Sequence, residues 1–245
     1  MNTVLTKPLT SKQTIGQMVA DRPSRAALFE RLGLDYCCGG KNQLETACQE
    51  KALNLSAVMR ELQECDARVD GEPEADWTAA PLEALVDHIL VAHHAYLKDA
   101  LPRLTLLIDK VDKAHGDSHP DLGELAATFS ALRRELEHHT NTEESVVFPL
   151  IRSLESGSSQ YRVPSSTFRD SIRTMESEHD RAGAELGKIR SLANDYVPPA
   201  DACNTFRAML DGLAELESDM HRHVHKENSI LFPRAAELEA LLATI

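Results

Sequence analysis

The sequence predicts an all-α protein, in which an antiparallel up-down-up-down four-helix bundle follows a small helical N-terminal domain. Four long segments repeat apolar residues at alternating spacings of three and four. Short polar stretches near 116–121, 157–165 and 194–201 separate them, and short connections favour antiparallel neighbours. The apolar residues are mainly Leu, Ala, Val and Ile, and only 4% of residues are aromatic, which suits helices better than sheet.

The first 68 residues are predicted to form the small helical domain (1–68). Helix start and stop signals place four short helices in it, over about 14–20, 23–33 and 44–53 and from a cap at Ser56 onward. Residues 69–80 are polar, contain Gly and Pro, and are predicted to form a linker. The remaining residues, 81–245, are expected to form the bundle.

The second bundle helix carries polar residues at positions that should be buried. His139 and Glu143 continue its apolar seam, so both are expected to face the core. The seam comprises Leu122, Leu125, Phe129, Leu132, Leu136, His139, Glu143, Val146 and Leu150. The fourth helix repeats the pattern with Phe206, Met209, Leu213, Leu216, Met220, His223, Glu227 and Ile230.

Each of the other two helices places one histidine on its seam. His179 lies among Phe168, Ile172, Met175, Ala182, Leu186 and Ile189, and His94 lies among Val86, Leu90, Leu97, Leu101 and Leu104. The histidines form an internal repeat, because His94 precedes His139 by 45 residues and His179 precedes His223 by 44. Two similar helical hairpins would therefore face each other around a pseudo-twofold site.

These six polar residues predict a site for two metal ions. Two carboxylates and four imidazoles in a dry core would cost more free energy than the marginal stability of a bundle allows, unless cations compensate them. Each ion would take two histidines, and Glu143 and Glu227 would bridge the pair. Imidazole and carboxylate ligands suit iron, manganese or zinc. Iron is favoured because carboxylate-bridged di-iron sites recur in helical bundles. With an oxo or hydroxo bridge added, positions stay open for dioxygen, nitric oxide, peroxide or water.

Two further glutamates lie close to predicted ligands in the sequence. Glu135 is one turn from His139, and Glu178 directly precedes His179. Both a role as acid or proton relay and a solvated helix charge fit them. The other histidines, including His93, are interpreted as ordinary surface or loop residues.

Adjacent Cys37 and Cys38, followed by two glycines, form the other candidate site. A glycine-rich loop is expected to expose two thiols that could attack a disulfide or hold a soft iron species. The alternative is that they fill a turn as small apolar side chains. Five cysteines, mostly in the first 65 residues, do not resemble a secreted disulfide framework, so reduced thiols are expected.

Charge and hydropathy exclude several function classes. The net charge of −13 argues against nucleic-acid binding, which needs a basic face. No apolar run is long enough to span a membrane, and residues 1–11 lack the pattern of a secretory signal. A cytoplasmic protein that binds neither nucleic acid nor membrane is expected.

The chain resembles the di-iron iron-sulfur cluster repair family, also called Repair of Iron Centers, over nearly its full length. The motifs that carry the likeness are Asp35-Tyr36-Cys37-Cys38-Gly39-Gly40-Lys41, the doubled His-x-x-x-Glu ending in Phe-Pro, and Met175-Glu176-Ser177-Glu178-His179-Asp180. The resemblance implies a hemerythrin-like bundle with iron ligands at His94, His139, Glu143, His179, His223 and Glu227. It also implies the functional cysteine pair Cys37 and Cys38, and acidic groups near the iron channel at Glu135 and Glu178.

The function that this resemblance implies is repair of iron-sulfur clusters damaged by nitrosative and oxidative stress, through iron handling and through binding or reduction of nitric oxide. The expected partners are nitric oxide or dioxygen, damaged iron-sulfur proteins and an unidentified electron donor. A hemerythrin-like sensor or carrier that acts through a partner protein is the alternative. The sequence leaves open whether the centre is a nitric oxide reductase, and whether the chain is a monomer or a homodimer.

Overall fold

The protein is helical throughout the part that the structure describes. The computed structural model describes residues 9–67, 75–157 and 165–242, and within these ranges it contains no strand, only an isolated antiparallel bridge between Thr14 and Gln43. The predicted all-α fold is therefore confirmed. Contacts divide the chain into two compact units, one of residues 1–81 with 224–234 and one of residues 82–223 with 235–245. The predicted linker, 69–80, falls partly outside the described residues, so the proposed domain boundaries stay a prediction.

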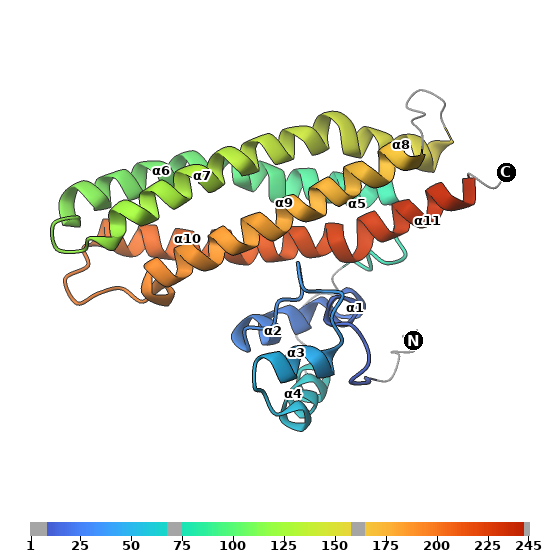
Figure 1. Ribbon diagram of the computed structural model, residues 1–245, viewed down its shortest axis with the longest axis horizontal. Helices are drawn as coiled ribbons and strands as arrows, with labels where there is room; N and C mark the ends of the chain where they lie inside the picture. Colours follow the sequence, from blue (N-terminus) through green and yellow to red (C-terminus); the bar gives the residue numbers. More distant parts are fainter. Residues whose placement is uncertain (1–8, 68–74, 158–164, 243–245) are drawn as a thin grey trace. The chain divides into compact units, whose positions relative to one another are not determined.

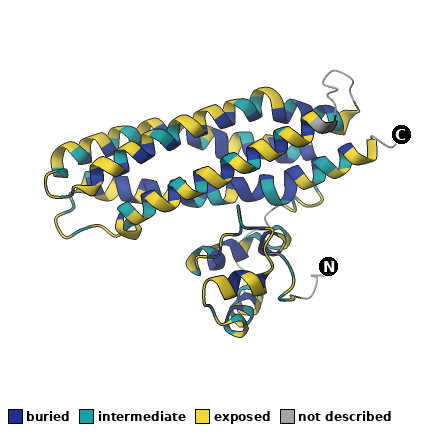
Figure 2. Ribbon diagram, viewed as in Figure 1, coloured by how far each residue is buried: buried dark blue, intermediate teal, exposed yellow. Residues whose placement is uncertain are grey.

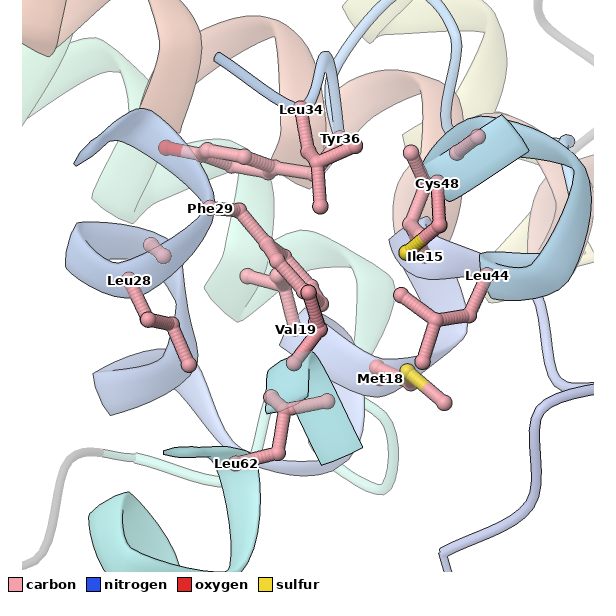
Figure 3. Close-up of a cluster of buried hydrophobic side chains, with 13 residues drawn as sticks. Ile15, Met18, Val19, Leu28, Phe29, Leu34, Tyr36, Leu44, Cys48 and Leu62 are labelled. Atoms are coloured by element: carbon pink, nitrogen blue, oxygen red, sulfur yellow. The ribbon is translucent and has the colours of Figure 1, made fainter. Parts of the chain in front are cut away.

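The N-terminal unit is built from short helices around one apolar cluster. They are α1 (Ile15–Asp21), η1 (Pro23–Arg25), α2 (Ala26–Arg31), α3 (Leu44–Glu50) and α4 (Leu55–Ala67). Figure 3 shows Phe29, fully buried, surrounded by side chains from the other helices. None of these helices is long enough to be stable alone, so burial in this cluster holds them together.

The N-cap of the last of these helices lies two residues earlier than the sequence suggested. Asn54, and not Ser56, caps α4: its side-chain oxygen accepts a hydrogen bond from the Ala57 backbone N–H at 3.0 Å. Asn and Ser are equally good N-caps, so capping preference could not decide between them. Gly33 follows α2 with φ +65°, a left-handed conformation that glycine adopts without strain.

Four long helices run in alternating directions to form the predicted bundle (Figure 1). The first joins α5 (Leu82–Ile89), η2 (Leu90–His94) and α6 (Ala95–His115). The second joins α7 (Asp121–Thr142), η3 (Glu143–Val147) and α8 (Phe148–Ser156), and the third is α9 (Ser165–Leu192), which η4 (Asn194–Tyr196) follows. The fourth joins α10 (Asn204–Lys226), η5 (Glu227–Leu231) and α11 (Phe232–Leu242), and it contains the 224–234 segment. Buried faces line the bundle interior (Figure 2).

Three of the four bundle helices contain a π-helical turn. The segments η2, η3 and η5 are π-helices, in which Ala95, Phe148 and Phe232 donate their backbone N–H to the carbonyl five residues earlier. A π turn takes one more residue than an α turn, so it changes which residues face the core. Two seam predictions are wrong for this reason. Val146 is 46% exposed while Val147 and Phe148 are buried, and Leu90 is only half-buried while Ile89 is buried.

Candidate metal centre

All six predicted ligands are buried in the bundle. None is more than 4% exposed, and Glu143, His223 and Glu227 are fully buried: the set is His94, His139, Glu143, His179, His223 and Glu227. The π turns place three of them, since His94 ends η2 while Glu143 and Glu227 begin η3 and η5. The other three lie on regular α-helix. Helical periodicity therefore identified every buried polar position of this cluster.

The six residues gather as two overlapping groups. His94, Glu143, His223 and Glu227 form one, and His139, Glu143, His179 and Glu227 form the other. Within each group, one nitrogen or oxygen atom per residue lies within 4.8 Å of the others. Each group thus has two histidines of its own, while both groups share the same two carboxylates.

The two oxygens of Glu143 face different groups. Its Oε2 lies 3.3 Å from the Nε2 of His94, and its Oε1 lies 3.4 Å from the Nε2 of His139. The Nε2 atoms of His139 and His179 are 2.9 Å apart. Donor atoms bound to one ion at 2.0–2.2 Å and at right angles lie about 3 Å apart, so these separations fit a shared ion shell. Glu143 thus directs one oxygen toward a histidine of each group.

Carboxylates outside the cluster fix the orientation of two of the imidazoles. The Nδ1 of His139 lies 2.7 Å from Glu178, and the Nδ1 of His94 lies 2.9 Å from Glu144. A carboxylate only accepts hydrogen bonds, so Nδ1 donates in each case and Nε2 is the ring nitrogen that faces the cluster. Each of these Nε2 atoms lies 3.3 or 3.4 Å from an oxygen of Glu143, which is the arrangement of two ligand atoms that share a cation. The residues present therefore fit two bound cations.

The structure separates the two glutamates that the sequence treated alike. Glu178 is half-buried and contacts His139, so it touches a predicted ligand. Glu135 is exposed on α7, and its charge adds to burial in raising the pKa of Glu185. No contact of Glu135 with the six-residue cluster is found among the described residues.

Sequence reasoning missed two groups beside the cluster. Glu144 contacts His94, and it also binds the Lys98 ammonium at 2.8 Å. Burial alone would raise the pKa of Glu144, but Lys98 and His94 outweigh burial and hold that pKa below its usual range. Its place directly after a predicted ligand was the available signal.

His93 is the second omission, because it was interpreted as an ordinary residue. It is only 3% exposed, its Nδ1 lies 2.9 Å from Asp219, and its ring stacks on His223 at 5.1 Å between centroids. The π turn η2 buries His93 and His94 together, which a regular helix pattern did not indicate. His93 therefore supports one face of a predicted ligand.

Comparison with known proteins places this architecture in a family. Residues 85–235 match Hemerythrin, described as the hemerythrin HHE cation binding domain, and residues 11–66 match ScdA_N, described as a domain of unknown function (DUF542). The iron-sulfur cluster repair proteins YtfE of Citrobacter koseri and Escherichia coli O157:H7 are each 38% identical over 224 residues, which is 91% of this chain and 96% of each relative. The chain belongs to this iron-sulfur cluster repair family. Its bundle is a hemerythrin domain.

In this family member, the cysteine pair lies in the N-terminal unit, within the segment that matches ScdA_N. The expected exposure of both thiols is wrong for Cys37, which is only 6% exposed, while Cys38 is half-buried. The Asp35 carboxylate accepts hydrogen bonds from the backbone N–H groups of Cys37 and Cys38, at 3.2 and 2.9 Å. Asp35, Cys37 and Cys38 form a third group with metal-ligand spacing.

The two thiols differ in their electrostatic surroundings. The Cys37 Sγ lies 3.9 Å from that of Cys38 and 3.2 Å from the Asp35 carboxylate. The hydrogen bond to Cys38 and burial raise the pKa of Cys37 well above its usual value, and the Asp35 charge adds to this. Cys37 is therefore held as a neutral thiol, and Cys38 is the more accessible sulfur.

No helix within the described residues is long and apolar enough to cross a membrane.

Proposed function

We propose that this protein repairs iron-sulfur clusters damaged by nitrosative and oxidative stress, by handling iron at a carboxylate-bridged di-iron centre that also binds or reduces nitric oxide. The observation that carries the proposal is Glu143, whose two oxygens face histidines of two different groups. The relatives, which are named iron-sulfur cluster repair proteins, supply the biological context. An electron donor and damaged iron-sulfur proteins would be the partners, and the cytoplasm the place of action.

The ligand set assigns a role to each of the six residues. His94 and His223 would hold one iron, His139 and His179 the other, and Glu143 and Glu227 would bridge them, with an oxo or hydroxo group. Two adjacent iron ions supply two electrons and neighbouring positions for small molecules. Burial of all six residues keeps bulk water away from those positions.

The proton for such a reaction would reach the centre through Glu178. This carboxylate contacts buried His139 and keeps 20% of its side-chain area exposed, so it touches both solvent and a ligand. Arg181 lies 3.7 Å from its other oxygen. Glu135 has no such position, so a proton-relay role falls to Glu178.

The proposal is tested first by metal analysis with optical and Mössbauer spectra of anaerobically purified protein. Two irons per chain and oxo-bridge bands that vanish in Glu143→Ala are expected. Nitrous oxide released over several turnovers, when nitric oxide and an external reductant are supplied, would support an enzyme. No bound metal after reconstitution with iron would overturn the proposal.

A second candidate function is a hemerythrin-like sensor or carrier for nitric oxide or dioxygen. The match to the hemerythrin domain favours it, since the same fold and ligand set suit reversible binding. Stoichiometric binding without turnover under reductant would support the sensor. Sustained turnover would exclude it as the main role.

The cysteine pair would act in repair, apart from the iron centre. We expect Cys38→Ser to lower the recovery of activity of a nitric-oxide-damaged iron-sulfur enzyme, because Cys38 is the accessible sulfur. Cys37→Ser is expected to act in the same direction. Both variants should keep the iron content and spectrum of the bundle. Loss of bundle iron in either variant would contradict this division of labour.

A homodimer formed through residues 1–68 stays a prediction.

A further inference from the structure

A second cluster of metal-ligating side chains lies at one end of the bundle. His115 ends α6 and His119 lies in the turn before α7, while Asp201 and Cys203 lie in the loop before α10. The turns joining α6 to α7 and α9 to α10 meet at this end (Figure 1, left). At a rise of 1.5 Å per residue, His115 lies about 30 Å along the helix from His94. The cluster is therefore separate from the six-residue centre.

Three of these residues bring donor atoms together, and the Cys203 thiol lies beside one of them. The Nε2 of His119 lies 3.1 Å from Asp201 Oδ2, and the Nε2 of His115 lies 3.3 Å from Cys203 Sγ. One donor atom each from His115, His119 and Asp201 lies within 4.8 Å of the others. Imidazole, carboxylate and thiolate are the ligands of zinc sites, and donors at 2.0–2.3 Å from a tetrahedral ion lie about 3.4 Å apart.

The surroundings fix the two imidazoles and favour the thiolate. The Phe206 ring lies against both imidazole rings, with its centroid 5.3 Å from that of His115 and 5.5 Å from that of His119. The Cys203 carbonyl accepts the Arg207 backbone N–H at the start of α10. The backbone N–H of Phe206 and the hydrogen bond to His115 lower the pKa of Cys203 to about 7.

We propose that His115, His119, Asp201 and Cys203 form a second metal site, which binds one borderline-soft divalent cation of the zinc type. Asp201 and Cys203 are exposed, so both side chains have room to rotate and close around an ion. A simple surface ion pair between His119 and Asp201 would not explain why His115 and a thiol converge beside it. A cavity of about 280 Å³, lined by His119 and Phe206, adjoins the cluster.

Zinc and cobalt ions are the probes for this site. Equilibrium dialysis with Zn²⁺ is expected to show that the full-length wild-type protein binds one more zinc ion per chain than the double variant His115→Gln, His119→Gln. Asp201→Asn is expected to weaken that ion's binding at least tenfold. In a background that carries Cys37→Ser and Cys38→Ser, which removes the thiols of the Asp35 turn, Co²⁺ is expected to give a thiolate charge-transfer band that Cys203→Ser loses, because the six-residue centre contains no sulfur ligand.

Matched variants control for general effects. Asp211→Asn removes an exposed carboxylate of α10 outside the cluster, and Cys65→Ser removes a thiol of the N-terminal unit, so neither should change zinc binding. Unchanged helicity by circular dichroism would show that the double variant folds. If the double variant does not fold, Cys203→Ser tests the site in its place. Equal zinc binding by wild type and the folded double variant would overturn the proposal, as would a cobalt band that Cys203→Ser leaves intact.

Discussion

At the scale of single residues, the centre depends on carboxylates that orient the histidines. His139 and His94 are each held through Nδ1 by a glutamate, Glu178 and Glu144, whose own side chains are only partly buried. Such partners fix both the tautomer and the ring orientation of a ligand. Sequence spacing suggested Glu135 and Glu178 equally, because both lie next to a ligand along a helix. Only the packing of α9 against α7 brings Glu178 to His139.

The first prediction tests this difference. Glu178→Gln is expected to weaken iron binding by 10- to 100-fold, since it removes the negative charge that His139 Nδ1 contacts. Glu135→Gln, on the exposed side of α7, is expected to leave iron affinity unchanged. Iron competition with a chelator of known affinity measures both. Equal affinity of the two variants would show that the contact with His139 does not tune the centre.

At the scale of helices, π turns decide how the ligands are presented. In both halves of the repeat, the π turn begins at the glutamate and is followed by Phe-Pro, at Pro149 and Pro233. Proline lacks the N–H that the carbonyl four residues earlier would accept, so the regular hydrogen-bond pattern cannot continue unchanged. Two consecutive buried apolar residues, Val147 and Phe148, were the sequence signal of the extra residue.

The second prediction concerns that extra residue. Deleting Val146, which is exposed, is expected to convert η3 to regular α-helix while Phe148 and the residues after it still face the core. Thermal unfolding should stay cooperative, but iron affinity should fall because Glu143 is displaced. Deleting Arg134, exposed in regular α7, is expected to rotate the following residues by about 100° and to abolish cooperative unfolding. Normal iron binding after loss of Val146 would contradict a role for the π turn.

The third prediction concerns a contact between elements of the N-terminal unit. Asp66 of α4 binds buried Arg25 of η1 at 2.6 Å and also Arg22 at 3.2 Å. Burial alone would raise the pKa of Asp66, but the two guanidinium groups outweigh it and lower that pKa below 3.8. Asp66→Asn is expected to cost about 2 kcal/mol at pH 7, because Arg25 loses a charged partner.

Because its folded pKa is depressed, Asp66 stabilises the unit above its unfolded pKa of 3.8 and loses this effect as pH falls through the lower folded pKa. The difference between wild type and Asp66→Asn should therefore shrink below about pH 4. Hydrogen exchange of α1 and α4 amides measures it. Asp21→Asn, at an exposed position where the carboxylate accepts a hydrogen bond from the Gln17 side chain, serves as the control. A pH-independent difference would refute the ion-pair explanation.

At the scale of the whole molecule, function and stability are linked through the centre. Four imidazoles and two carboxylates occupy bundle positions that apolar residues would otherwise fill. Cations that bind the folded chain and not the unfolded one stabilise it by mass action. The bundle thus gives up apolar packing at its middle, and bound cations would restore stability there.

The fourth prediction follows from this linkage. Removing bound iron with a chelator is expected to lower bundle stability by about 2.7 kcal/mol where free metal had been at 100 times the dissociation constant. For a domain of this size that corresponds to about 5–10 °C in the melting temperature. The chelator should not change the melting temperature of the double variant Glu143→Gln, Glu227→Gln. An unchanged wild-type melting curve would show that iron binding and folding are independent.

The sequence by itself determined the helical fold and the six buried polar positions. Helical periodicity is a local property, so His139 and Glu143 could be placed on a core face without knowledge of their neighbours. The family motifs added the cysteine pair, since Asp35 to Lys41 is a contiguous segment. What is encoded in spacing along one helix could thus be predicted.

Only the tertiary structure decided which residues meet across helices. Several features depend on side chains from different segments: the position of Glu143 between His94 and His139, the contact of His94 with Glu144, the contact of Glu178 with His139, and the burial of Cys37. The π turns belong to the same class, because packing selects them over the α-helix that local propensity favours. The gathering of His115 with Cys203, 88 positions apart, arises likewise from the meeting of two loops at one end of the bundle.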